Sequence, residues 1–230
     1  MIAQNREILE DRIRRACERA GRERDEICIV AVSKTFAVER IREAMDAGFR
    51  DFGENYVQEL EEKRSKLGHD PRWHFVGHLQ TNKVKYIAGY VHLIHSVDNF
   101  RLAQEIQKRA EKATRTVDVL VEVHTTGEAT KYGVLPDRTE ELVRQIAGLD
   151  RVRVHGLMTM GPFSDDPNDS RPSFRRLSDL KRRIEDQGIP MSHLSMGMTH
   201  DFEVAIEEGA TILRIGTAIF GERKKKERTI

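Results

Sequence analysis

The chain has 230 residues, of which 38% are hydrophobic and 33% are charged, so it contains enough apolar side chains for a sizeable core. Its formal net charge of +1 predicts no general attraction to nucleic acid or to a membrane surface. Residues 1–21 lack the apolar run of a signal peptide, and no stretch approaches the ~20 apolar residues of a membrane span. Cys17 and Cys28 suit free thiols in a reducing compartment, which favours a cytoplasmic α/β protein.

Short apolar or β-branched runs recur along the chain, separated by polar stretches with helical spacing. The expected strands are 27–34, 49–54, 72–78, 90–97, 116–124, 151–160, 192–197 and 211–217. A helix at about 3–20 is expected before the first strand, with an apolar stripe of Leu9, Ile13, Ala16, Cys17 and Ala20. This alternation predicts a single (β/α)8 TIM barrel over residues 1–230 with an extra N-terminal helix. The alternative is an open doubly wound sheet.

Two further segments stand out by composition. Residues 161–173, GPFSDDPNDSRPS, predict a long, mobile polar loop. The basic tail at about 222–230 is interpreted as a solvated end.

Lys34 ends the first expected strand, ICIVAVSK, and raises the question of why an ammonium group sits there. Side chains alternate along a strand, so an inward Lys34 places Val32, Val30 and Cys28 inside the barrel as well. Lys34 is then the last inward residue, at the mouth where barrel enzymes gather function. Taken alone, Lys34 could simply extend its ammonium group to water from the end of the strand.

The last two expected strands supply complementary groups at the same mouth. Arg214 faces inward from 211–217, and Gly216 and Thr217 follow it. Ser195 and Gly197 end the preceding strand, before a helix expected to begin near Thr199. Loops after strands 7 and 8 commonly bind phosphate in such barrels. An amine, a phosphate site and an arginine together indicate pyridoxal phosphate (PLP), whose aldehyde forms a Schiff base with lysine.

The motifs AVSKT, FGENYVQEL, WHFVGHLQTNK, GEATKYGV, GLMTMGP and LSMGMTHDFEVAIEEGATILRIGTAIFGER resemble the YggS/PROSC family of PLP-binding homeostasis proteins over about residues 5–223. The resemblance implies one barrel of the alanine racemase N-terminal type (fold type III). It implies that Lys34 carries PLP as a Schiff base, that Arg214 faces the ring nitrogen and that Asn55 lies near the ring. It also implies that Ser195, Gly197, Gly216 and Thr217 hold the phosphate.

Two positions and the tail after Gly221, which is unusually basic, depart from the family pattern. Thr199 stands where the family usually has serine, which keeps a hydroxyl, whereas His124 stands where it usually has asparagine. The histidine makes the polar contacts on that side of the mouth uncertain.

Several of these residues have a structural alternative. Arg214 could form a buried ion pair with Glu122, and Asn55 could cap the helix that follows it. The nine histidines show no HxH or HExxH pattern, so no metal site is predicted. Lys131, in the loop GEATKYG, is hypothesised to help load or hand off the anionic cofactor.

The resemblance implies a carrier that buffers PLP, delivers it to PLP-dependent enzymes and has no dedicated reaction. The first alternative is an amino-acid racemase. That reaction needs an acid or base on each face of the bound substrate, and two-domain racemases take the second group, a tyrosine, from an added domain. No room is expected for that domain, and we therefore expect a non-enzymatic monomer. The second alternative is a regulatory module that binds a partner protein without PLP.

Overall fold

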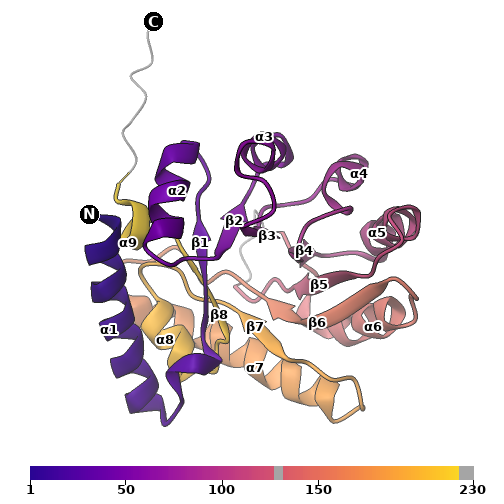
Figure 1. The fold of residues 1–230 in the computed structure, drawn as a ribbon. Coiled ribbons are helices and arrows are strands. Elements are labelled where there is room, and N and C mark those ends of the chain that lie inside the picture. The colour runs from indigo at the N-terminus through magenta and orange to yellow at the C-terminus, as the bar shows by residue number, and fades with distance from the viewer. Residues whose placement is uncertain (127–131, 223–230) are drawn as a thin grey trace, which may run out of the picture.

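The computed structural model describes residues 1–126 and 132–222. Its centre is a closed barrel in which parallel strands pair in chain order and the last strand pairs with the first (Figure 1). The strands are β1 Cys28–Val32, β2 Asp51–Glu54, β3 Arg72–Phe75, β4 Leu93–Val97, β5 Val117–Glu122, β6 Val152–Met158, β7 His193–Ser195 and β8 Ile212–Ile215. The predicted barrel is confirmed, and the open sheet is excluded.

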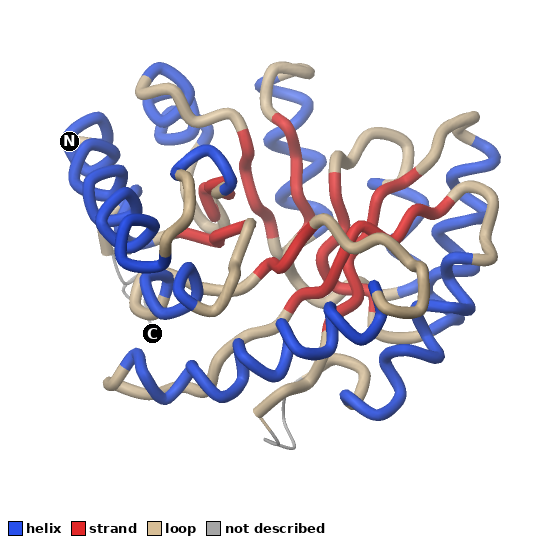
Figure 2. The backbone as a smooth tube through the Cα atoms, turned by 90° about the horizontal axis from the view of Figure 1, so that it is seen from below, coloured by secondary structure: helices blue, strands red, loops and turns tan. Residues whose placement is uncertain are grey.

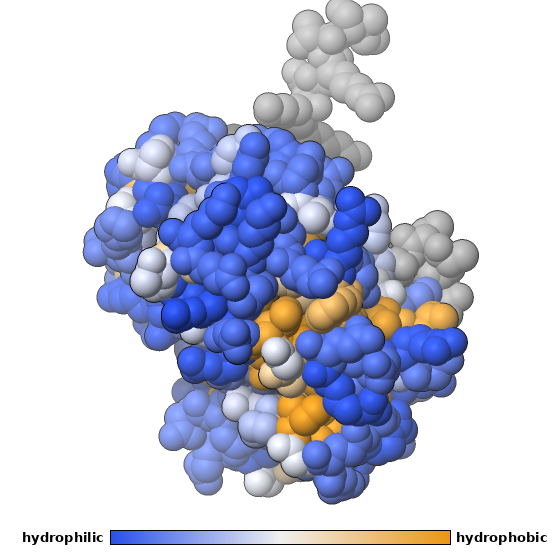
Figure 3. All heavy atoms as spheres, turned by 90° about the vertical axis from the view of Figure 1, so that its right-hand side faces the viewer, coloured by the Kyte–Doolittle hydropathy of each residue, from blue (hydrophilic) through white to orange (hydrophobic). Residues whose placement is uncertain are grey.

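Helices surround this barrel, as the view from below shows (Figure 2). They are α1 Ile2–Ala20, α2 Val38–Asp46, α3 Val57–Leu67, α4 Val84–Ile87, α5 Phe100–Lys112, α6 Pro136–Ala147, α7 Arg171–Glu185, α8 Phe202–Glu207 and α9 Thr217–Phe220. Short 3-10 helices occupy Arg24–Glu26, Thr81–Lys83 and Pro167–Ser170. No helix within the described ranges combines the length and the apolar character needed to cross a membrane. The face drawn in Figure 3 is mostly hydrophilic, with hydrophobic residues gathered in patches near its centre and below it.

The core has two layers, because both faces of every strand in such a barrel are covered. Inside the barrel, Val30, Leu93, Leu120, Met158 and Ile212 pack together. The outward residues of the strands pack against the helices in a much larger cluster. On β1 the predicted alternation is confirmed: Val30 belongs to the inner cluster, and Ala31 belongs to the outer one.

Each expected strand contains an observed strand, but the observed strands are shorter. On β1 the pairing ends at Val32, so Lys34 lies in a turn just beyond the strand. On β8 it ends at Ile215, and Thr217 already begins α9. The predicted strands are longer than the observed ones because the residue pattern alone does not show where hydrogen bonding to the neighbouring strand ends.

Helix α1 covers the side of the barrel where the chain closes on itself. It lies beside α8 and α9, both of which are short, and its buried stripe includes Leu9, Ile13 and Cys17 (Figure 1). The guanidinium of Arg12 pairs with Glu203 on α8 at 2.9 Å. The predicted N-terminal helix therefore supplies the outer layer that these two short helices leave incomplete.

The segment 161–173, predicted as a loop, is partly helical. Residues Pro167–Ser170 form a 3-10 turn that runs directly into α7. Asp166 caps the turn by accepting a hydrogen bond from the amide of Asn168, and the buried hydroxyl of Ser170 donates to Asp201 at 2.8 Å. The prediction of an extended mobile loop is wrong for its second half, because polar capping side chains stabilise a turn there.

Candidate functional site

A cavity of about 270 Å³ opens at the carboxyl ends of the strands; we call it the mouth cavity. It is lined by Val32, Lys34, Asn55, Val76, Met160, Met198, Thr199, His200, Arg214, Gly216 and Thr217. Five of the seven predicted cofactor-binding residues therefore meet there: Lys34, Asn55, Arg214, Gly216 and Thr217. Ser195 and Gly197 are not among the lining residues. The structure thus brings most of the predicted residues together, and their contacts with a cofactor stay a prediction.

Lys34 is presented by a tight turn after β1. The amide of Phe36 donates to the carbonyl of Ser33 at 3.0 Å, which closes the turn. Within it, Thr35 has a φ of 69°, a left-handed conformation that a β-branched residue rarely adopts. Such strain persists only where surrounding contacts enforce it, and it is typical of functional turns.

Those enforcing contacts come from a buried cluster of Glu54, Glu59 and Lys63. The Lys63 ammonium donates at 2.7 Å to the carbonyl of Ser33, to Glu54 and to Glu59. The hydroxyl of Ser33 donates to Glu54 at 2.6 Å, and the amide of Thr35 donates to Glu59. The residues before and after the lysine are therefore fastened to β2 and α3. Glu59, near the start of α3, and Lys63, one turn later, share a helix face.

Burial dominates the chemistry of Glu54 in this cluster. It raises the pKa of Glu54 to about 7, against the opposing effects of the Lys63 charge and the Lys63 and Ser33 hydrogen bonds. Sequence reasoning missed this cluster, since Glu54 and Lys63 meet only when β2 and α3 pack beside β1. The one available signal was a lysine in the helical segment after GEN at a position that becomes buried.

Arg214 is the buried cation of the mouth cavity, with 5% of its surface exposed. Its Nη1 donates to both the carbonyl and the hydroxyl of Ser195, each at 2.7 Å, and its Nη2 donates to the carbonyl of Thr159 at 2.8 Å. Burial lowers the pKa of Arg214 to about 10, which still leaves it protonated at neutral pH. No ion pair joins it to Glu122 among the described residues, so the ion-pair alternative is not supported.

The hydroxyl of Ser195 continues into a chain of buried polar groups inside the barrel. It lies 2.9 Å from Nδ1 of His95, whose Nε2 lies 3.0 Å from Nδ1 of His74. Nε2 of His74 in turn lies 3.0 Å from Oδ1 of Asp51. The chain runs from the mouth to the opposite end of the barrel, which we call the floor.

The donor and acceptor groups at the two ends set the direction of the hydrogen bonds in this row of buried polar groups. Burial would raise the pKa of Asp51, but hydrogen bonds from His74 and Arg72 bring it below its usual value, so the carboxylate only accepts. Burial lowers the pKa of His95 well below its usual value, which makes its ring neutral. Because Arg214 can only donate at one end and the Asp51 carboxylate can only accept at the other, these hydrogen bonds are satisfied when they run from Arg214 through Ser195, His95 and His74 to Asp51.

Ser195 is not among the residues that line the cavity, and its contact with the phosphate stays a prediction. Its side chain is fully buried and hydrogen-bonded to Arg214 and His95, and it does not face the cavity. Gly197 is required by packing, since its φ is 91° and a Cβ there would lie 2.6 Å from Cβ of Ala205. A hydroxyl that does line the cavity is that of Thr199.

Gly216 differs from Gly197 in what the fold demands. Its φ is negative, and a Cβ there would meet only Val32, with the carbonyl oxygen at an ordinary 3.6 Å and Cβ at 3.9 Å. The chain's own packing therefore does not require glycine at 216, whereas close approach of a ligand to the backbone would. Helix α8 begins at Phe202, three residues after the expected start at Thr199, so the segment 198–201 forms a turn over the cavity.

The remaining predicted positions have mixed outcomes. Asn55 does not cap the following helix, because the residue at the N-cap of α3 is Tyr56, and Asn55 lines the cavity instead. His124 follows β5, where its amide donates to the carbonyl of Val134 at 2.9 Å. Lys131 lies outside the described residues.

Comparison with known proteins shows the family of this chain. The family model for the alanine racemase N-terminal domain matches residues 5–224. A pyridoxal phosphate homeostasis protein from Aquifex aeolicus (strain VF5) is 52% identical over 216 residues, covering 93% of this chain and 95% of that protein. The chain belongs to the alanine racemase N-terminal domain family, among its pyridoxal phosphate homeostasis proteins. A mouse protein with that name is 43% identical over 209 residues, covering 85% of this chain and 76% of the mouse protein.

Two solved structures match the fold of this chain at different levels of sequence identity. PipY of Synechococcus elongatus PCC7942, solved with PLP bound, is 31% identical with a TM-score of 0.84 and covers 96% of this chain and 100% of PipY. An alanine racemase from Clostridium difficile 630 is 14% identical with a TM-score of 0.77, and the match covers 94% of this chain and 56% of the racemase. The second likeness concerns the fold alone.

Proposed function

We propose that this chain holds pyridoxal 5'-phosphate in the mouth cavity through Lys34 and buffers and delivers it inside the cell. The observation that carries the proposal is the meeting of Lys34, Arg214 and Gly216 in one cavity of about 270 Å³. The family supports it, since homologues that the chain matches over nearly their whole length are named for PLP homeostasis, and PipY has been solved with PLP bound.

Each of these groups suits one part of the ligand. The amine of Lys34 would react with the aldehyde to form a Schiff base. Gly216 and Thr217 would offer backbone amides to the phosphate, and the hydroxyl of Thr199 lies on the same wall. The guanidinium of Arg214, fixed by three hydrogen bonds, would face the ring nitrogen. Asn55 would contact the ring from the β2 side.

In this proposal Ser195 and Gly197 act indirectly. Ser195 fixes the guanidinium of Arg214, and Gly197 allows the chain to turn tightly between β7 and α8. The phosphate role predicted for their side of the mouth passes to residues 198–200, which line the cavity.

We propose a carrier and not an enzyme because the described cavity wall offers few groups that move protons. Its ionisable side chains are Lys34, His200 and Arg214. Arg214 stays protonated, and Nε2 of His200 donates to the carbonyl of Asp165 at 2.8 Å. Racemisation needs a second acid or base opposite the lysine. We propose that the protein works as a monomer whose recipients are PLP-dependent enzymes that lack their cofactor.

The deciding experiment is an absorbance titration with PLP, followed by borohydride reduction and peptide mapping. We expect a yellow protein that carries the reduced label on Lys34, and a Lys34→Ala variant without the visible band. Lys112→Ala, at an exposed position of α5, is the matched control and should bind PLP normally. Label on another residue, or none, would refute the proposal.

A second measurement separates the carrier from the racemase. Loaded protein is incubated with an L-amino acid in D2O, and exchange of the α-hydrogen is followed by NMR. A carrier gives at most slow exchange, and it restores activity to a PLP-dependent enzyme that lacks its cofactor. Rapid exchange with formation of the D-isomer would overturn the carrier assignment and leave PLP binding intact.

A further inference from the structure

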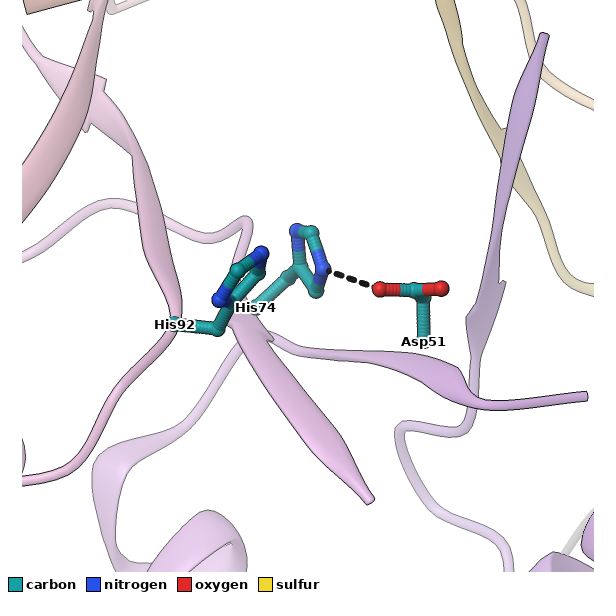
Figure 4. A group of neighbouring side chains, drawn as sticks. All are labelled: Asp51, His74 and His92. Atoms are coloured by element: carbon teal, nitrogen blue, oxygen red, sulfur yellow. Dashed lines mark hydrogen bonds and ion pairs between the residues drawn. The ribbon is translucent and has the colours of Figure 1, made fainter.

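The floor of the barrel, opposite the mouth cavity, gathers imidazole groups that the proposed function does not use. His74 lies within β3, and His92 immediately precedes β4. Their rings lie 5.1 Å apart between centroids, and the carboxylate of Asp51 on β2 faces His74 (Figure 4). His193 starts β7 at the same end of the barrel. The sequence alone concealed this cluster, because its members come from different strands and only barrel closure brings them together.

Three donor atoms of this cluster lie close to one another. One ligand atom each from Asp51, His74 and His92 lie within 4.8 Å of one another. Two ligands bound at 2.0–2.2 Å to one tetrahedral ion lie about 3.4 Å apart. Oδ1 of Asp51 and Nε2 of His74 are already 3.0 Å apart, and the exposed His92 can turn toward them.

The surroundings hold two of these ligands in position. Nδ1 of His74 lies 3.0 Å from His95, the kind of outer contact that orients metal-binding histidines. Arg72 donates to Oδ2 of Asp51 at 2.6 Å, which leaves Oδ1 directed at His74. His74 and Asp51 are 2% and 7% exposed, so both have few alternative orientations.

We propose that Asp51, His74 and His92 form a binding site for a divalent cation of the zinc class. Two imidazole nitrogens and one carboxylate oxygen suit Zn²⁺, Co²⁺ or Ni²⁺ and disfavour Mg²⁺ and Ca²⁺. When the ion binds Nε2 of His74, the single ring proton of His74 lies on Nδ1 and is donated to Nε2 of His95, which lies 3.0 Å away. The three side chains leave a fourth position of the ion to water. The site is separate from the mouth cavity and does not depend on PLP binding.

The test is calorimetric titration of the untagged, metal-free chain with Zn²⁺, with Co²⁺ as a spectroscopic probe. We expect one ion per chain and Co²⁺ bands typical of four-coordinate nitrogen and oxygen ligation. His92→Ala, which removes an exposed side chain, should weaken binding tenfold or more, and so should Asp51→Asn. His69→Ala, another exposed histidine, should bind as the wild type does.

Two further results decide the proposal. The Lys34→Ala variant should bind Zn²⁺ as tightly as wild type, which excludes chelation by PLP at the mouth. Absence of saturable binding at one ion per chain would overturn the site. Unchanged binding in a His92→Ala variant that keeps the native fold by circular dichroism would also overturn the site. If Asp51→Asn does not fold, His92→Ala alone decides the proposal.

Discussion

Arg214 donates to both the carbonyl and the hydroxyl of Ser195, each at 2.7 Å. One residue of β7 thus fixes the guanidinium that β8 places in the mouth cavity. The same hydroxyl lies 2.9 Å from Nδ1 of His95, so Ser195 joins the mouth to the buried imidazoles beneath it. We propose this positioning role for Ser195 in place of the phosphate contact that the family resemblance implies.

Ser195→Ala should therefore destabilise the protein by about 1–3 kcal/mol, because it leaves Nδ1 of His95 buried without a partner. PLP affinity should fall as well, since Arg214 loses one of its three acceptors. Urea unfolding and PLP titration measure the two effects. Ser96→Ala is the control: Ser96 is equally buried, and its hydroxyl makes no hydrogen bond, so its removal should cost little. Equal behaviour of the two variants would contradict the positioning role.

Gly216→Ala and Gly197→Ala should separate ligand binding from folding. At 216 the added methyl meets no close atom of the protein, so stability should change by less than about 1 kcal/mol while PLP affinity falls about tenfold. At 197 the positive φ and the 2.6 Å approach to Ala205 should destabilise the fold by several kcal/mol. Thermal melts and PLP titrations test the pair, and unchanged PLP affinity in Gly216→Ala would contradict the phosphate assignment.

Glu122 should make stability fall as pH rises. Burial, and secondarily the charge of Asp98, raise its pKa from 4.5 to about 7, so the folded protein holds this proton more tightly than the unfolded chain does. Its stabilising contribution is present below pH 4.5 and is lost as pH rises through 7, by roughly 3 kcal/mol at 1.36 kcal/mol per pKa unit.

Glu122→Gln removes this titration. The unfolding free energy of the wild type relative to Glu122→Gln should therefore be lower at pH 8 than at pH 5. Urea unfolding at both values measures the difference, and Glu111→Gln, at an exposed position, should show none. A wild type that gains stability relative to Glu122→Gln across this range would exclude the raised pKa.

Lys63→Met should loosen the turn that carries Lys34. It removes donors to Ser33, Glu54 and Glu59 and leaves the Glu54 carboxylate buried without its cation, a loss of about 3–5 kcal/mol at pH 8. Adding Glu54→Gln should recover part of that loss. Lys66→Met, on the exposed side of the same helix, should change stability by less than about 0.5 kcal/mol. Equal losses of stability in the two lysine variants would refute the role of Lys63 in holding the turn that carries Lys34.

The sequence predicted the barrel and most of the mouth cavity because both follow from local patterns. Alternation along β1 places Lys34 beyond the last inward valine, and the same rule applied to β8 gives Arg214 and Gly216. It did not predict that Ser195 points inward to His95, since that contact depends on which strands lie opposite each other inside the barrel.

The buried partners of the lysine turn and the floor cluster were missed for a related reason. Glu54 and Lys63 meet Ser33 only through packing between consecutive βα units, and Asp51, His74 and His92 meet across three strands. Single-strand histidine spacing, the test applied to the sequence, cannot detect ligands that barrel curvature brings together.

The pairing of β1 with β8 has a consequence for how the protein matures. Lys34 and Arg214 are separated by most of the chain, and they become neighbours only when Val30 aligns with Arg214 at this last seam. A partly assembled barrel therefore has the amine and the arginine without a shared pocket. Under the proposed function, capture of the vitamin would report that the ring is complete, and the captured molecule would bridge the first and last strands and oppose their separation.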